Sequence, residues 1–193
     1  MADTPAEFDG LALVGGAPAL DFVNSVKFRG KRDPGERLLS FGALVNWAEI
    51  AGIITREEAQ RLNGQSGENA LRLAVGLRES FRAFLSDPHD PTSCAHLERQ
   101  LSRAKPRLRI EPVSGRAVEE MPIVRAEDLV RRLEAEIIRF LTSWDQRRTR
   151  ACAADDCDWM FVDRTKPGRR KWCDSRTCGN RDRVRRHRQG DAA

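Results

Sequence analysis

Long hydrophobic runs are absent from this sequence of 193 residues. No apolar stretch approaches the roughly 20 residues that a membrane-spanning helix requires. The first ten residues, MADTPAEFDG, are acidic and lack the basic and then apolar pattern of a secretory signal. These absences lead us to expect a globular protein of the cytoplasm, with no membrane partner.

Catalytic signatures are absent as well. Residues 1–150 contain no pairing of a nucleophile with a base, no phosphate-binding loop and no cluster of acidic metal ligands. The chain also has no internal repeat and no long low-complexity linker. We therefore do not expect an enzyme. The length suits a domain of about 150 residues followed by a small appendage.

Cysteine is scarce over most of the chain and concentrated near its end. Four of the five cysteines form two C-x4-C pairs, which fifteen residues separate. In a reducing compartment, such pairs are more often metal ligands or redox centres than structural disulfides. The C-x-x-C spacing of a dithiol redox centre does not occur. Four thiolates suit tetrahedral zinc, and an iron–sulfur cluster is the alternative. The predicted zinc ligands are Cys152, Cys157, Cys173 and Cys178.

The residues around these cysteines predict a module that folds on its metal. The large apolar side chains nearby form a core too small to fold unaided, and they are Trp159, Met160, Phe161, Val162 and Trp172. Zinc would supply the missing folding energy, on the order of 10 kcal/mol. The segment KPGRR predicts a turn. The segment GNRDRVRRHR predicts a short basic helix with the last thiolate at its start, where the helix dipole favours negative charge.

The net charge of +5 is unevenly distributed. Residues 1–150 carry +1 and residues 151–193 carry +4. Between Arg164 and Arg188, eleven basic residues accompany only two acids. Such a run is typical of proteins that bind nucleic acid or another anionic surface. A solvated, charged terminus is the alternative interpretation.

Residues 40–101 show helical periodicity with local start and stop signals. Ser40 predicts the start of one helix, and Gly52 its end. Thr55 and Glu58 have the spacing of a capping box. Further helices are predicted over residues 68–86 and from Pro91, which Asp90 precedes.

The periodicity then changes to alternation. Leu108 and Ile110 alternate with charged residues, a turn is expected at Ser114 and Gly115, and Val118 resumes the pattern, which predicts a β-hairpin. A long helix follows over about residues 125–148. We therefore predict an α+β protein, with a mostly helical N-terminal domain over 1–150 and a metal module over 151–193.

Both parts resemble a known architecture. The C-terminal region from Cys152 to about Arg188 resembles the CGNR zinc finger family, through its four cysteines, the stretch FVDRTKPGRRKWCDSRTCGNRDRVRRHR and the Cys-Gly-Asn-Arg signature within it. The segment GGAPALDFVNSV and the helix around Trp47 resemble ABATE, the N-terminal domain that accompanies this finger. The resemblance implies a treble-clef type finger that binds DNA, in a stress-induced transcription regulator whose N-terminal domain senses a ligand.

Arginine and lysine side chains of the finger would neutralise phosphates and release counterions. On a helix, Arg181, Arg185 and Arg188 share one side. Asn180 could contact nucleic acid or have a structural role beside the zinc. We favour the structural role for Asn180, and also for Gly179. The candidate nucleic-acid contacts are Arg169, Arg170, Lys171, Asn180, Arg181, Arg183, Arg185, Arg186 and Arg188.

Other partners stay open. Asp21 and Asn24 are candidates for a small-molecule pocket, although Asp and Asn more often secure turns and caps. RNA is an alternative to DNA, since Trp159 or Trp172 could stack on bases. A third reading is a protein-interaction module with a purely structural zinc site. A homodimer is also compatible with the sequence.

Overall fold

Short hairpins and helices make up the computed structural model, which describes residues 7–8, 10–27 and 35–190. Over these ranges it contains seven helices, and every strand pairs within a two-stranded antiparallel hairpin. The predicted α+β class, mostly helical with small hairpins, is confirmed. Over the same ranges, none of the helices combines the length and the apolar character needed to cross a membrane.

The chain forms two compact units, and the first and last segments belong to the same one. We call residues 38–143 the helical unit, and residues 1–37 together with 144–193 the terminal unit. The division at residue 150 stays a prediction about sequence domains. By packing, the chain divides elsewhere, because the N-terminal segment joins the cysteine module.

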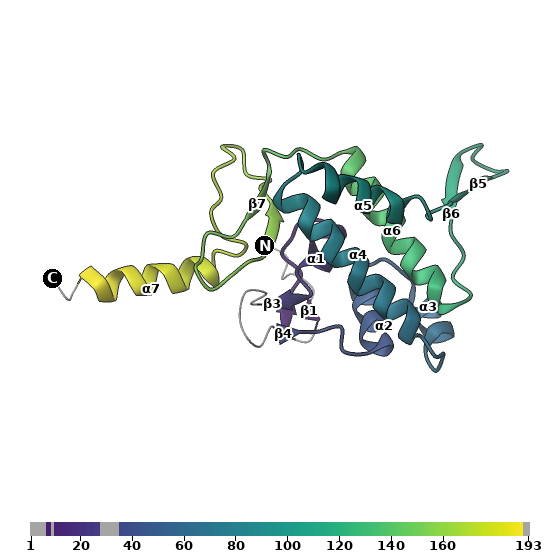
Figure 1. Cartoon of the computed structure of the whole chain (residues 1–193), viewed down its shortest axis with the longest axis horizontal. Coiled ribbons are helices and arrows are strands. Elements are labelled where there is room, and N and C mark those ends of the chain that lie inside the picture. Colours follow the sequence, from purple (N-terminus) through teal and green to yellow (C-terminus); the bar gives the residue numbers. More distant parts are fainter. Residues whose placement is uncertain (1–6, 9, 28–34, 191–193) are drawn as a thin grey trace. The chain divides into compact units, whose positions relative to one another are not determined.

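Helices dominate the helical unit (Figure 1), with α4 packed against α2, α5 and α6. Its core includes the fully buried Trp47, Leu77, Phe81 and Leu129. The Phe81 and Phe140 rings meet edge to face, with centroids 5.9 Å apart. The elements are α2 (Phe41–Ile50), α3 (Arg56–Leu62), α4 (Glu68–Ser86), α5 (Pro91–Leu101), β5 (Arg107–Ile110), β6 (Ala117–Glu120) and α6 (Ala126–Thr142).

Local capping determines where these helices start, as the sequence predicts. The Ser40 hydroxyl accepts a hydrogen bond from the backbone N–H of Ala43 at 3.1 Å, at the start of α2. Thr55 and Glu58 form the reciprocal capping box of α3. Asp90 accepts hydrogen bonds from the N–H groups of Thr92 and Ser93 before α5. Each cap satisfies donors that the first helical turn leaves unpaired.

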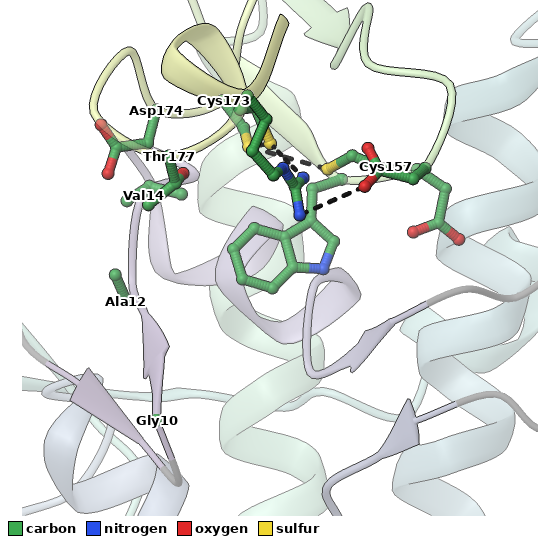
Figure 2. A pocket seen from close by; sticks show the side chains of 12 residues that line it. Gly10, Ala12, Val14, Cys157, Cys173, Asp174 and Thr177 are labelled. Atoms are coloured by element: carbon green, nitrogen blue, oxygen red, sulfur yellow. Dashed lines mark hydrogen bonds and ion pairs between the residues drawn. The ribbon is translucent and has the colours of Figure 1, made fainter. Parts of the chain in front are cut away.

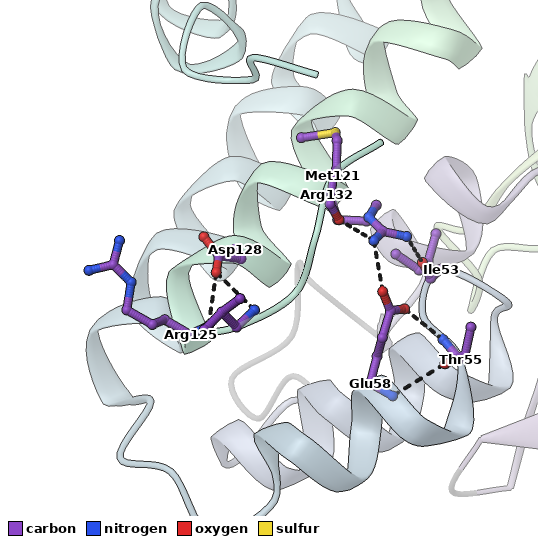
Figure 3. A network of polar contacts seen from close by, with 8 residues as sticks. Ile53, Thr55, Glu58, Met121, Arg125, Asp128 and Arg132 are labelled. Atoms are coloured by element: carbon purple, nitrogen blue, oxygen red, sulfur yellow. Dashed lines mark hydrogen bonds and ion pairs between the residues drawn. The ribbon is translucent and has the colours of Figure 1, made fainter. Parts of the chain in front are cut away.

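A partly buried arginine joins several segments within the helical unit (Figure 3). Arg132 of α6 donates to the Glu58 carboxylate at 3.0 Å and to the carbonyl groups of Ile53 and Met121. Glu58 thus serves the α3 cap and Arg132 at once. Because one charge pair serves both the cap and the packing of α6, these segments are fixed relative to one another.

The predicted hairpin is present, but the long helix ends early. Strand β5 pairs with β6 in a register that places Ile110 opposite Ala117. Helix α6 stops at Thr142 rather than near residue 148, and the Ser143 hydroxyl bonds back to the carbonyl groups of its last turn. Trp144, expected on the helix, instead donates to the Thr149 hydroxyl at 2.8 Å. The spacing of apolar residues could not predict this helix end, because it does not show where a side chain competes for the backbone carbonyl groups.

The terminal unit combines small elements from both ends of the chain. Helix α1 packs against strand β8, and β7 pairs with β8 in an antiparallel hairpin. The elements are β1 (Glu7–Phe8), β2 (Leu11–Ala12), α1 (Pro18–Val23), β3 (Val26–Lys27), β4 (Gly35–Glu36), β7 (Thr149–Ala151), β8 (Met160–Val162) and α7 (Cys178–Gly190).

Candidate metal centre and nucleic-acid interface

Four cysteine sulfurs converge at one point of the terminal unit. The ligand atoms of Cys152, Cys157, Cys173 and Cys178 all lie within 4.8 Å of one another. The sulfur of Cys173 is 3.7 Å from that of Cys157 and 3.6 Å from that of Cys178. All four thiols are free of disulfides. The predicted ligand set is therefore assembled.

The spacing of the sulfurs fits zinc. Four thiolates at about 2.3 Å from one ion, at the corners of a tetrahedron, lie about 3.8 Å apart. The 3.6 and 3.7 Å separations agree with that arrangement. The donor set is also right, because zinc favours thiolates and four of them complete its shell. When bound, such an ion holds the fold and offers no open position for chemistry.

The proton affinities of the thiols also suit a cation site. Hydrogen bonds from Cys157 and Cys173 lower the pKa of Cys152 to about 2. Because Cys157 is a donor to Cys152, its own pKa rises to about 12, and that of Cys173 is raised for the same reason. These shifts show that the thiols lie close enough to hydrogen-bond to one another, and a metal ion competes with their protons for the sulfurs.

The backbone and one arginine support the sulfurs from outside. The N–H of Cys173 donates to the sulfur of Cys152 at 3.4 Å. The guanidinium of Arg181 donates to the sulfur of Cys178 at 3.1 Å. Such outer contacts stabilise thiolates and orient metal ligands. Arg181, predicted as a nucleic-acid contact, therefore also has a role beside the metal site.

The core under the cysteines is larger than predicted. Trp159 and Phe161 are buried with Ala154 and three of the cysteines, and Trp172 packs partly buried against them. Val14, from the other end of the chain, also packs against this cluster. The predicted miniature core is present but incomplete without the N-terminal segment, which reaches it through tertiary contacts alone.

Asn24 attaches the N-terminal segment to the finger. Its amide nitrogen donates to the carbonyl of Met160 at 2.8 Å, and its carbonyl oxygen accepts from the N–H of Met160 at 2.8 Å. Both contacts are buried. The side chain thereby occupies the place of a neighbouring strand along one edge of β8. This engagement favours a structural role for Asn24 over a ligand contact.

The paired glycines extend the same edge. The carbonyl of Gly15 accepts from the N–H of Val162 at 2.8 Å, and the carbonyl of Gly16 accepts from Arg164 at 2.6 Å. A Cβ on Gly15 would lie 2.9 Å from the Asp21 carboxylate. Gly16 has a φ of +78°, which favours glycine. The glycine pair thus permits close backbone contact.

Asp21 secures this turn. Its carboxylate accepts a hydrogen bond from the N–H of Gly15 at 2.7 Å. Burial raises the pKa of Asp21 to about 7, against the opposing effect of that hydrogen bond. A pocket role for Asp21 stays a prediction. Its observed partner is the backbone of the segment that binds β8.

Asp163 organises the predicted turn between the cysteine pairs. It accepts hydrogen bonds from the hydroxyl and the N–H of Thr165 and from the N–H of Arg170. The Thr165 hydroxyl and these N–H groups lower the pKa of this carboxyl despite its burial. Gly168 completes the turn with a φ of +60°. The KPGRR turn is confirmed.

Arg170 stabilises the loop that follows. Its guanidinium donates to the carbonyl groups of Trp172 and Cys173. It also lies 4.5 Å from the centroid of the Phe161 ring. These contacts place a predicted nucleic-acid residue inside the module, where it holds the segment that carries the third ligand.

Helix α7 begins at the fourth ligand, as predicted, and its first residues explain the Cys-Gly-Asn-Arg signature. A Cβ on Gly179 would lie 3.0 Å from the Trp172 ring, so glycine permits this close approach. The exposed Asn180 accepts a 3.4 Å hydrogen bond from Arg183. Three of the four signature residues therefore serve the metal site or the packing around it.

Acidic residues hold part of the arginine cluster. Arg181 pairs with Asp156 at 3.2 Å, and Arg185 pairs with Asp155 and with Asp182. Asp182 is only 9% exposed and also holds Arg186 at 2.8 Å. These ion pairs reduce the positive charge that the start of α7 presents.

Four other predicted contacts of the finger are exposed and carry no ion pair within the part of the chain that the structure describes. They are Arg169, Lys171, Arg183 and Arg188. Along one side of α7, Asn180, Arg181, Val184, Arg185 and Arg188 line a shallow groove. The structure therefore divides the predicted contacts into residues engaged within the finger and residues available to a polyanion.

A cavity of about 260 Å³ lies beside the sulfurs (Figure 2). Ala12 and Val14 line it together with Cys157, Cys173 and Thr177. Asp21 and Asn24 are not among its lining residues. This cavity could not be predicted from the sequence, because residues more than 140 positions apart form it.

Comparisons with known proteins agree with this geometry. The family model ABATE, described as "Putative stress-induced transcription regulator", matches residues 16–153. The model of the CGNR zinc finger matches residues 148–190. A search of curated proteins gave no match.

Proposed function

The chain belongs to the ABATE family and ends in a CGNR zinc finger, and from this premise we propose that it is a zinc-dependent, DNA-binding transcription regulator. Both families are described as regulators or zinc fingers rather than as enzymes. The proposal concerns the DNA contact and a sensing role for the N-terminal domain.

One observation carries the proposal: an exposed basic helix starts at a metal ligand. Cys178 begins α7, and exposed arginines follow along its length. A zinc ion held by the four cysteines would determine where this helix starts and in which direction it points. A helix that the fold holds in place can bind along a DNA duplex with its cations already ordered. A free basic tail would lose more conformational entropy on binding.

The unpaired cations would make the first phosphate contacts. Arg183 and Arg188 lie on α7, and Arg169 and Lys171 lie on the loop before the third ligand. Each neutralised phosphate releases condensed counterions, so binding weakens steeply with salt. Val184, which is 42% exposed beside them, offers an apolar contact of the kind that thymine methyl groups accept.

The arginines held in ion pairs can also contact DNA if a phosphate replaces their carboxylate partner. The side chain of Asp155 is 77% exposed, and those of Asp156 and Arg181 are about half exposed. Exposed ion pairs contribute only about 0–1 kcal/mol. A phosphate can therefore replace Asp155 or Asp156 at little energetic cost.

Duplex DNA is a better partner than RNA for this surface. The RNA alternative needs an aromatic ring that bases can stack on. Trp159 is only 8% exposed, and its indole N–H donates to the carbonyl of Val26 at 3.3 Å. Trp172 is half-buried against Gly179. Neither residue is exposed, whereas RNA-binding modules that stack on bases use exposed aromatic rings.

The test is the binding of a generic DNA duplex to the zinc-loaded full chain, followed by fluorescence anisotropy over a range of salt concentrations. Cys173→Ser should abolish binding, because it breaks the metal shell. Arg183→Ala combined with Arg188→Ala should weaken binding and reduce the salt slope by about two. The matched control, Arg72→Ala with Arg131→Ala, changes the net charge equally on the helical unit.

Two results would reject the proposal. One is a full chain that binds no duplex at low salt. The other is a loss of binding that is the same in the α7 variants and in the charge-matched control. Competition between the DNA duplex and structured RNA at the same salt concentration distinguishes DNA binding from RNA binding. A partner captured equally after nuclease treatment would favour the protein-interaction alternative, and sedimentation of the same samples reports on a homodimer.

A further inference from the structure

A groove in the helical unit carries a buried acid that the finger does not use. The groove has a volume of about 860 Å³ and lies between the segment after α5, the segment after β6 and one side of α6. Glu134 of α6 lines it and is 2% exposed. The volume is far above the roughly 30 Å³ of one water and lies in the range of small-molecule sites.

Glu134 lacks a hydrogen-bond partner for one of its oxygens. Within the described residues, nothing donates to its Oε2 atom, which is shielded from solvent. Burial raises the pKa of this carboxyl to about 7, against the opposing charges of Arg103 and Arg131. A buried carboxyl left unpaired costs free energy, so native proteins generally supply it with a donor.

The other acids of the groove are already engaged. Asp128 accepts from the N–H groups of Val124 and Arg125 and pairs with Arg131 at 2.6 Å. Glu120 pairs with Arg109 at 3.9 Å, and Glu127 accepts from Asn69 at 3.5 Å. Glu134 is thus the lining acid with a buried oxygen to which none of the described residues donates a hydrogen bond.

Three cations of the groove show the opposite pattern. Arg103 and Lys105 are exposed along the segment after α5, and Arg107 is exposed at the start of β5. None of the three has an ion pair among the residues that the structure describes. The wall between them and Glu134 includes apolar side chains such as Val130 and Met121.

We propose that this groove binds a small zwitterion of the amino-acid type. Its ammonium group would donate to the Glu134 carboxyl, and its carboxylate would meet Arg103 and Lys105. The apolar wall would receive the rest of the molecule. Charge-assisted contacts at both ends distinguish such a ligand from a simple amine or a simple acid. The exposed Arg103 and Arg131 side chains reorient to admit it.

This inference deepens the proposed function, since it supplies the ligand class for the sensing half of a regulator, and it rests on that function only for its biological meaning. Binding is measured without DNA, so the two proposals fail separately. A chain that binds an amino acid but no DNA would reject the regulator and leave the groove assigned.

The experiment is calorimetric titration of the zinc-loaded full chain with each of the twenty common L-amino acids. At least one should bind. The corresponding amine without the carboxylate, and the acid without the ammonium group, should bind about tenfold more weakly or worse, because each lacks one charge-assisted contact.

Variants test the two ends of the site. Glu134→Gln and Arg103→Gln should each weaken binding about tenfold or more. The control Glu136→Gln removes an acid of the same helix that pairs with Arg139 at 2.6 Å outside the groove, and it should bind like the wild type. Circular dichroism checks that every variant keeps its helices.

Three results would overturn the inference: no amino acid binds, binding survives both Glu134→Gln and Arg103→Gln, or the simple amine or acid binds as tightly as the amino acid. The first result would leave water as the partner of Glu134.

Discussion

Asn24 and Asp21 show how much single residues of the N-terminal segment contribute to the finger. Both are buried, and both bind backbone groups rather than other side chains. Asn24 serves β8, and Asp21 serves the turn that presents Gly15 to β8. The segment that resembles the ABATE hallmark is, in these contacts, a scaffold for the zinc site.

Replacing Asn24 by alanine should destabilise the terminal unit. Both polar groups of Met160 would lose their buried partner, at about 1–3 kcal/mol for each unsatisfied group. Urea unfolding followed at the tryptophans measures the loss. Asn69→Ala, at an exposed position of α4, is the control and should change little. Equal stability of the two variants would show that Asn24 does not hold β8.

The pH dependence of Asp21 provides a second test. Its pKa is about 7 in the fold against an ordinary 3.8. Between pH 4 and 7 the unfolded chain therefore loses this proton while the folded chain retains it, so stability falls as the pH rises. The slope approaches about 1.4 kcal/mol per pH unit, and above pH 7 the loss is complete.

Asp21→Asn cannot ionise and keeps an oxygen for the N–H of Gly15. We expect its stability relative to the wild type to increase from pH 4 to pH 7 and then to level off. Denaturant unfolding of both proteins across this range measures the difference. Because Glu134 and the thiols titrate in both proteins, their effects cancel. A difference that does not vary with pH would mean that Asp21 ionises normally in the fold.

At the scale of elements, helix α7 and the loop before β8 act as one charged surface. Asp155 and Asp156 of this loop form ion pairs with Arg185 and Arg181 of the helix. The carboxylates thus stand where phosphates would be in the proposed complex. They limit the charge of the interface without blocking it, because the pairs are exposed and weak.

Removing these two carboxylates should strengthen DNA binding. Asp155→Asn combined with Asp156→Asn frees two arginines, so affinity for a generic duplex should rise and the salt slope should steepen by up to about two. Anisotropy titrations measure both quantities. Glu119→Gln with Glu136→Gln, two acids that pair with Arg139 of the helical unit, makes the same change in net charge. An equal gain in this control would show that the effect comes from the net charge of the protein and not from freeing these two arginines.

At the scale of the whole molecule, the two ends of the chain share one unit, whereas residues 38–143 form another. The cysteine cluster lies in the first. Because a metal contributes folding energy where its ligands are, its removal should affect the two units differently.

Chelation should therefore loosen the terminal unit selectively. In the full chain, amide hydrogen exchange should accelerate in β7, β8, the start of α7 and α1, while α4 and α6 should keep their protection. Zinc should restore the protection, and magnesium, which prefers oxygen ligands, should not. Unchanged protection of β8 after metal loss would show that the fold of the finger does not depend on its ion.

Features that depend on neighbours in the sequence were predictable. The caps at Ser40, Thr55 and Asp90 act within four residues of the helix starts. The ligand set was predictable because the two C-x4-C pairs supply the four thiolates that a zinc ion favours. The end of α6 was missed because apolar spacing continues past Thr142, whereas the Ser143 hydroxyl donates back to the carbonyl of Arg139 where the helix ends.

Only the tertiary structure decided what the charged and polar residues do. Asn24 and Met160 are 136 positions apart, and no periodicity links such a pair. The same holds for the ion pairs of Arg181 and Arg185, and for Glu134, whose partners depend on packing. The sequence by itself determined the capped starts of α2, α3 and α5 and the zinc ligands, because local geometry and ligand chemistry are sufficient for those. The fold determined which acids and amides are engaged, because burial and distance arise only when segments separated in the sequence pack together.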